Sequence, residues 1–138
     1  MQKVIIDTNV IVSALISYSY PAKILEKLVF GLKVTPCLTT EIFEEYLDVL
    51  RRDKFKKVPD FVNKAEVVLV KFREISSLYF TNTKIELLTD ISDNKFLELA
   101  AVSSADFLIT GNTMDFRLKE FEYTRIVTPR EYWDFYRP

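Results

Sequence analysis

Short runs of strand-forming residues, such as the β-branched Val4-Ile5-Ile6, recur along the chain, and segments with helical spacing separate them. The sequence predicts strands over 4–6, 33–35, 78–80, 107–109 and 125–127. Val4-Ile5-Ile6 is typical of a strand that is buried on both faces. Strands that alternate with helices indicate an α/β fold: a three-layer sandwich whose central parallel sheet has about four or five strands and helices on both faces. In such sheets the functional crevice lies beyond the carboxyl ends of the strands.

Helices are predicted between these strands from apolar spacing and from capping residues. Pro21 is expected to open one helix, and Gly31 is expected to be its C-cap. Thr39 or Thr40 is expected to cap a helix over roughly 41–52. The other predicted helices cover 10–15, 61–76, 93–103 and the segment that Pro129 opens.

The size and composition of the chain predict one domain, residues 1–138. No segment approaches the roughly 20 apolar residues of a membrane span, and Asp7 comes too early for a signal peptide. We therefore expect a cytoplasmic protein that does not contact membranes. The formal net charge is −1, so any binding of nucleic acid must come from a local basic patch.

The rarest residue types exclude most catalytic chemistry. The chain has no His, which removes Ser-His-Asp triads, Cys-His pairs and His-containing zinc sites. Its single Cys, Cys37, excludes an intramolecular disulfide and an all-cysteine zinc site. Two glycines cannot form a Gly-rich phosphate loop. An enzyme with this composition must use carboxylates, Lys, Tyr or a bound metal.

Acidic residues stand where the predicted sheet would place a site. Asp7 ends the first strand, Asp115 follows the strand over 107–109, and Asp93 begins the helix before that strand. Glu45 lies at the edge of the apolar stripe of its helix, whereas Glu44 and Asp48 are expected on a solvated face. Taken alone, Asp7 is more often a turn residue and Asp93 an N-cap, whereas Glu45 fits a solvated face and a functional site about equally. Together they would repel, and a hard divalent cation such as Mg²⁺ or Mn²⁺ would compensate.

Five segments, in order along nearly the whole chain, carry a family resemblance. They are Val4-Ile5-Ile6-Asp7-Thr8-Asn9-Val10, Thr39 through Phe55, Asp90 through Ala100, Ala105 through Phe116, and Ile126 through Tyr132. The chain resembles the PIN domain, and within it the small prokaryotic toxins of toxin–antitoxin pairs, the VapC-like group. The resemblance implies Mg²⁺- or Mn²⁺-dependent cleavage of RNA.

The resemblance also assigns roles to individual residues. Asp7, Glu45 and Asp93 would hold the metal, with Asp115 as a fourth, outer ligand. Asn9 and Thr110 would orient ligands or phosphate through hydrogen bonds.

Two positions leave the assignment open. Many relatives have Asp directly after Thr-Gly, where this chain has Asn112, a neutral ligand that would hold a second metal more weakly. Glu44 replaces Glu45 if the register of the helix differs by one residue.

Contact with RNA requires cations, and one dense basic run follows the acidic helix. Its members are Arg51, Arg52, Lys54, Lys56 and Lys57. The run is either a patch that tracks phosphates or a solvated helix end. Arg117 and Lys119 are second candidates. The C-terminal aromatics Tyr132, Trp133, Phe135 and Tyr136 are too many for one buried face, and indicate an interface in a homodimer or with an antitoxin.

Three functions compete on these observations. The first is a metal-dependent endoribonuclease, the toxin of a toxin–antitoxin pair. The second is a degenerate PIN-like module that binds RNA or protein without cleavage, which Asn112 favours. The third is another α/β phosphate enzyme. A haloacid-dehalogenase-type phosphatase would need Asp at position 9, which is Asn9. A receiver domain would need paired acidic residues after its first strand and an acceptor Asp after its third strand, and neither can be placed in this sequence.

Overall fold

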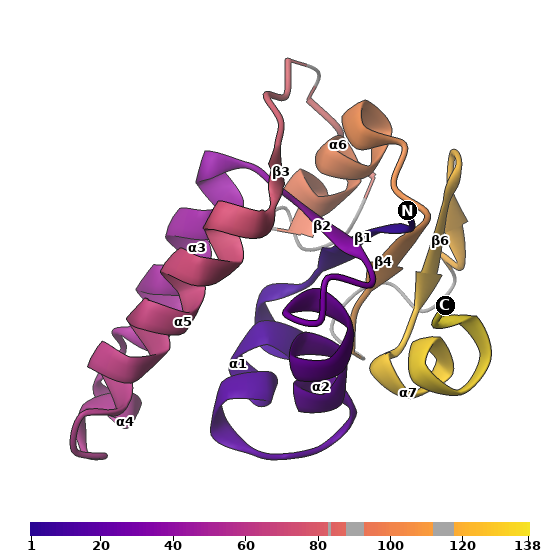
Figure 1. Ribbon diagram of the computed structural model, residues 1–138. Coiled ribbons are helices and arrows are strands. Elements are labelled where there is room, and N and C mark those ends of the chain that lie inside the picture. The colour runs from indigo at the N-terminus through magenta and orange to yellow at the C-terminus, as the bar shows by residue number, and fades with distance from the viewer. Residues whose placement is uncertain (83, 88–92, 112–117) are drawn as a thin grey trace.

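A mostly parallel β-sheet forms the centre of the molecule in the computed structural model, which describes residues 1–82, 84–87, 93–111 and 118–138 (Figure 1). The strands are β1 (Lys3–Ile6), β2 (Thr35–Leu38), β3 (Ser77–Leu78), β4 (Phe107–Ile109), β5 (Glu120–Phe121) and β6 (Thr124–Val127). Their order in the sheet is β3-β2-β1-β4-β6-β5, and only β5 is antiparallel to its neighbour. The predicted α/β class is confirmed.

The second strand differs from its prediction over 33–35. It starts at Thr35 and continues through Pro36, which was expected to end it. The Thr35 N–H donates to the Gln2 carbonyl on the β1 side, at 2.9 Å. The Pro36 nitrogen therefore faces β3, which begins to pair only at Cys37 and Ser77. Because no partner strand needs an N–H there, proline costs no hydrogen bond in the sheet.

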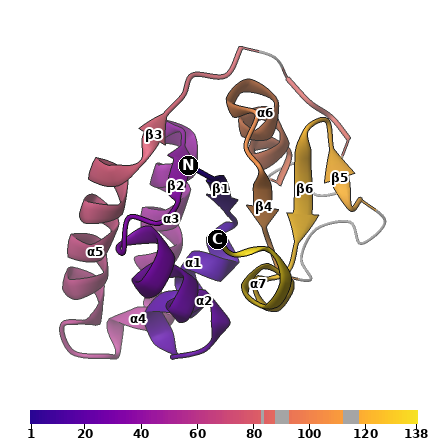
Figure 2. The same cartoon turned by 45° about the vertical axis from the view of Figure 1, so that its right-hand side comes forward.

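Helices lie in the connections β1–β2, β2–β3 and β3–β4, and two further helices follow β6. They are α1 (Thr8–Ile16), α2 (Tyr20–Lys23), the π-helix η1 (Ile24–Val29), α3 (Thr40–Leu50), α4 (Asp53–Lys56), α5 (Phe61–Ile75), α6 (Asn94–Ser103), α7 (Pro129–Glu131) and the π-helix η3 (Tyr132–Tyr136). The helices α3 and α5 lie side by side, with α4 at the end of the pair that points away from the sheet (Figure 1). The short helix α2 lies beside α7 (Figure 2).

The C-terminal end of η1 differs from the expected glycine cap. The residue with left-handed backbone is Leu32, at φ 57°, and not Gly31. A Cβ atom at position 31 would lie 2.2 Å from the carbonyl oxygen of Lys27. Gly31 has no left-handed backbone, and glycine is needed here for the close approach of the backbone to the Lys27 carbonyl.

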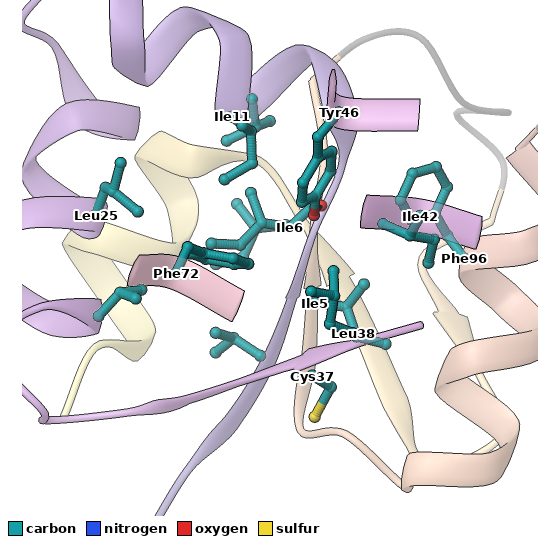
Figure 3. Close-up of a cluster of buried hydrophobic side chains, with 14 of the residues drawn as sticks. Ile5, Ile6, Ile11, Leu25, Cys37, Leu38, Ile42, Tyr46, Phe72 and Phe96 are labelled. Atoms are coloured by element: carbon teal, nitrogen blue, oxygen red, sulfur yellow. Dashed lines mark hydrogen bonds between the residues drawn. The ribbon is translucent and has the colours of Figure 1, made fainter. Parts of the chain in front are cut away.

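The core lies on both faces of the sheet. In Figure 3, Leu25 of η1 and Phe96 of α6 lie on opposite sides of Ile5 and Ile6 in β1. These four side chains are buried, as is Tyr46 of α3. The predicted three-layer α/β/α arrangement is confirmed. Within the described ranges, no helix combines the length and apolar character that crossing a membrane requires.

Candidate active site

The carboxyl ends of β1 and β4 place Asp7 beside Thr110. Both residues directly follow their strands, and the Asp7 N–H donates to the Ile109 carbonyl at 3.0 Å. The Thr110 hydroxyl donates to Oδ2 of Asp7 at 2.7 Å. Asp7 is only 3% exposed, so its carboxylate is held in a fixed, buried position at this edge of the sheet. Both residues stand where the strand pattern predicts them.

Glu45 reaches the same edge from α3, which packs against α1. The Thr8 hydroxyl, one residue after Asp7, donates to one oxygen of the Glu45 carboxylate. The other oxygen lies 2.5 Å from Nζ of Lys95. Glu45 is half-buried, whereas Glu44 is exposed. Glu45, and not Glu44, therefore faces the end of β1.

Tyr46 lies beneath these carboxylates. Its hydroxyl donates to the Ile6 carbonyl, and the side chain is fully buried. Burial raises the pKa of the Tyr46 hydroxyl well above its usual value, and the nearby charges of Asp7 and Glu45 raise this pKa further. Tyr46 is therefore a neutral hydrogen-bond donor that fixes the end of β1, and it is not a proton-transfer group near neutral pH.

The start of α6 supplies the third part of the site. Asp93 is at the N-cap position, half-buried, and makes no side-chain capping hydrogen bond. Asn94 is buried and Lys95 contacts Glu45. Since α6 packs on β1, β2 and α3, its first turn lies at the same side of the sheet as Glu45. Sequence reasoning missed Lys95, because no local pattern links this residue to Glu45.

The fit of this site to a divalent metal is incomplete. The atoms of this site that could bind a metal are carboxylate and hydroxyl oxygens, which suit a hard cation such as Mg²⁺. However, the described ranges contain no group of three or more acidic or cysteine side chains that could hold a metal ion. Both oxygens of Glu45 have protein partners instead. Asn112 and Asp115 lie outside the described residues, so the metal-ligand set stays a prediction.

Most of the other predicted binding residues are also within the described ranges. Asn9 is exposed on the first turn of α1. The predicted basic run, Arg51 to Lys57, covers the end of α3 and α4. Its Arg51 makes an ion pair with Glu66 at 2.7 Å. Lys119 is exposed before β5, and Arg117 lies outside the described residues.

The C-terminal aromatics are more fully packed than the sequence suggests. Tyr132 is buried and donates its hydroxyl hydrogen to Gln2. The ring of Tyr136 lies 5.1 Å from that of Phe107, measured between centroids. Phe135 is 75% exposed. An interface on this segment stays a prediction.

Comparison with known proteins identifies the family of this chain. Residues 3–114 match the model of the PIN domain family. The chain is also 31% identical to the uncharacterized protein MJ1680 of Methanocaldococcus jannaschii over 139 residues, which covers 94% of this chain and 88% of that protein. PIN domains are generally nucleases and typically use divalent metals. The chain belongs to the PIN domain family.

Proposed function

We propose that this PIN domain is a Mg²⁺- or Mn²⁺-dependent endoribonuclease, with Asp7, Glu45, Asp93 and Asp115 as its acidic residues. One observation carries the proposal. The buried Asp7 carboxylate, held by Thr110, lies one residue from Thr8, whose hydroxyl holds Glu45. Two carboxylates are thus held by neighbouring hydrogen bonds at the carboxyl end of β1, and parallel sheets place their functional sites at this end of their strands.

The side chains of the site have distinct tasks in this proposal. Asp7 and Glu45 supply anionic oxygen atoms, and the hydroxyls of Thr110 and Thr8 fix the orientation of these carboxylates. Tyr46 keeps the end of β1 in place through the Ile6 carbonyl. A bound divalent cation would lower the pKa of a water molecule and neutralise charge on the phosphate.

Features outside the carboxylates support an RNA substrate and a protein partner. Lys54 and Lys57 are exposed on and beside α4, at the far end of the α3–α5 pair. Cations in such a position attract phosphates of single-stranded RNA. Exposed Tyr18 and Phe135 support contact with a second copy of the chain or with an antitoxin. We include the toxin role and the homodimer in the proposal on this basis.

A cleavage assay with matched variants tests this function. Wild-type protein should cut single-stranded RNA with Mg²⁺ or Mn²⁺ and stop when EDTA is added. Asp7→Asn and Glu45→Gln should each lose at least about a hundredfold in rate, because each removes a proposed metal ligand. Asp48→Asn and Glu44→Gln carry the same charge changes on the exposed face of α3 and should retain wild-type rates. Full activity in Asp7→Asn would contradict the site assignment.

A second candidate function has a specific observation in its favour. Because Lys95 and Thr8 already hold Glu45, the described site resembles a compensated polar cluster. This favours a PIN-like module that binds RNA or protein without cleavage. Wild-type protein that binds RNA but cuts none with either metal ion would support this second function and contradict the first.

A further inference from the structure

Lys95 is a charged residue at the site for which the proposed reaction has no use. Its Nζ lies 2.5 Å from Oε1 of Glu45, and the two side chains are 13% and 25% exposed. The surface pair of Lys27 and Glu26, in contrast, leaves both side chains 58% exposed. The Lys95–Glu45 pair is thus sheltered from water, where a charge interaction is weakened less by solvent and salt.

The position of Lys95 in its helix is unfavourable by itself. Lys95 is the second residue of α6, which begins at Asn94. A cation in the first turn opposes the helix dipole, which favours negative charge at this end. Holding a long Lys side chain in one conformation also costs entropy. The ion pair with Glu45 compensates for these two costs. The reason for a lysine at this position therefore lies in the carboxylates of the site and not in helix α6.

We propose that Lys95 is the resident counter-cation of the carboxylate site and competes with a divalent cation for Glu45. This inference rests on the proposed metal-dependent function. Thr8 engages one oxygen of Glu45 and Lys95 engages the other. A divalent cation that takes Glu45 as a ligand must therefore displace the Lys95 ammonium group or share the carboxylate with it. Lys95 is a positioning residue that lowers the divalent affinity of the site.

Binding of Mn²⁺ to the full chain without RNA tests this proposal independently of catalysis. Calorimetric titration would compare wild type with Lys95→Gln and Lys95→Arg after treatment with EDTA. Lys95→Gln should bind Mn²⁺ at least about tenfold more tightly, because a positive charge close to the ion is removed. Lys95→Arg keeps that charge and should bind like the wild type.

Lys33→Gln is the matched control for net charge. Lys33 is exposed and precedes β2, at the opposite end of the sheet from Glu45. Solvent and salt screen a charge at that distance, so its removal should change Mn²⁺ affinity by less than about twofold. If Lys33→Gln and Lys95→Gln raised the affinity for Mn²⁺ by the same factor, the proposal would be overturned in favour of a general effect of net charge.

The same substitution made in protein that already carries Glu45→Gln tests whether Lys95 acts through Glu45. In Glu45→Gln protein, the further change Lys95→Gln should tighten Mn²⁺ binding by a smaller factor than in the wild type. The same factor in both backgrounds would overturn competition for Glu45. Circular dichroism in EDTA would check that each variant is folded, and Lys95→Arg provides the comparison if Lys95→Gln is unstable.

The possible failures are distinguishable. If wild type and Lys95→Gln bind Mn²⁺ equally, the role of Lys95 is overturned while the metal site stands. If none of the folded variants binds Mn²⁺ or Mg²⁺, the metal-dependent function itself fails, and the proposal for Lys95 fails with it.

Discussion

The Thr110 hydroxyl donates a hydrogen bond to Oδ2 of Asp7 over 2.7 Å, between residues that are 103 positions apart in the sequence. Both side chains are buried, at the ends of the neighbouring parallel strands β4 and β1. A buried carboxylate needs such donors, because an unpaired charge in the interior is costly. The hydrogen bond therefore contributes both to the stability of the sheet and to the orientation of the Asp7 carboxylate.

Thr110→Val should destabilise the protein by about 1–3 kcal/mol. Valine keeps the shape of the side chain but leaves the buried Asp7 carboxylate without this donor. Urea unfolding at neutral pH would measure the change. Thr40→Val, at an exposed position of α3, is the control and should stay within about 0.5 kcal/mol of the wild type. An unchanged midpoint for Thr110→Val would show that this hydrogen bond contributes nothing to stability.

Stability should fall as the solution becomes alkaline. Burial raises the pKa of the Tyr46 and Tyr132 hydroxyls above the usual value of about 10. Above that pH the unfolded chain loses these protons before the folded protein does. The stabilisation is therefore complete below about pH 10 and is lost as the pH rises through the folded pKa values. Burial also raises the pKa of the Cys37 thiol, which adds a loss in the same direction.

Urea unfolding at several pH values between about 8 and 11 would check this prediction. In Tyr46→Phe the free energy of unfolding should fall less steeply above about pH 10, since one buried hydroxyl no longer ionises. Tyr18→Phe removes an exposed hydroxyl and should follow the wild-type curve. Parallel curves for Tyr46→Phe and the wild type would contradict the assigned role of burial.

Much of the fold follows from local sequence signals. Short continuous apolar runs predict β1 and β4 closely, because a strand buried on both faces consists largely of apolar residues. Thr39 caps α3 as predicted, with its side chain accepting from the Ile42 N–H at 3.1 Å. The hairpin of β5 and β6 was not predicted, because the two residues of β5, Glu120 and Phe121, are too few to form a pattern.

The site is less predictable because its contacts are long-range. The strand pattern predicts Asp7 at the end of β1, and the helical pattern predicts Glu45 at the edge of a buried stripe. Neither pattern contains the contact of Glu45 with Lys95, which depends on how α6 packs against α3. The C-cap expected at Gly31 was wrong for a local reason, since the residue with left-handed backbone after the π-helix η1 is Leu32.

The two glycines of the chain should respond differently to alanine. In Gly31→Ala the new Cβ would meet the Lys27 carbonyl oxygen at 2.2 Å, so the backbone must shift. Overpacking of this kind costs about 1–3 kcal/mol. A Cβ at Gly111 meets no atom of the described residues within 4 Å, and Gly111→Ala should change stability by less than about 0.5 kcal/mol. Urea midpoints of the two variants would compare them directly, and equal midpoints would contradict the close approach at Gly31.

The basic run at the end of α3 should act on RNA affinity and not on the cleavage step. Arg51 already pairs with Glu66, so the exposed Lys54 and Lys57 are the better positions to test. The double variant Lys54→Ala/Lys57→Ala should raise KM for RNA and leave kcat unchanged. The dependence of log affinity on log salt should weaken by about 0.7 for each phosphate contact that is lost.

Lys64→Ala/Lys71→Ala removes two exposed cations from α5 and is the control for net charge. A lower kcat with unchanged KM in the Lys54/Lys57 variant would place the run in the chemical step, and an equal effect in the control would remove any special role of α4.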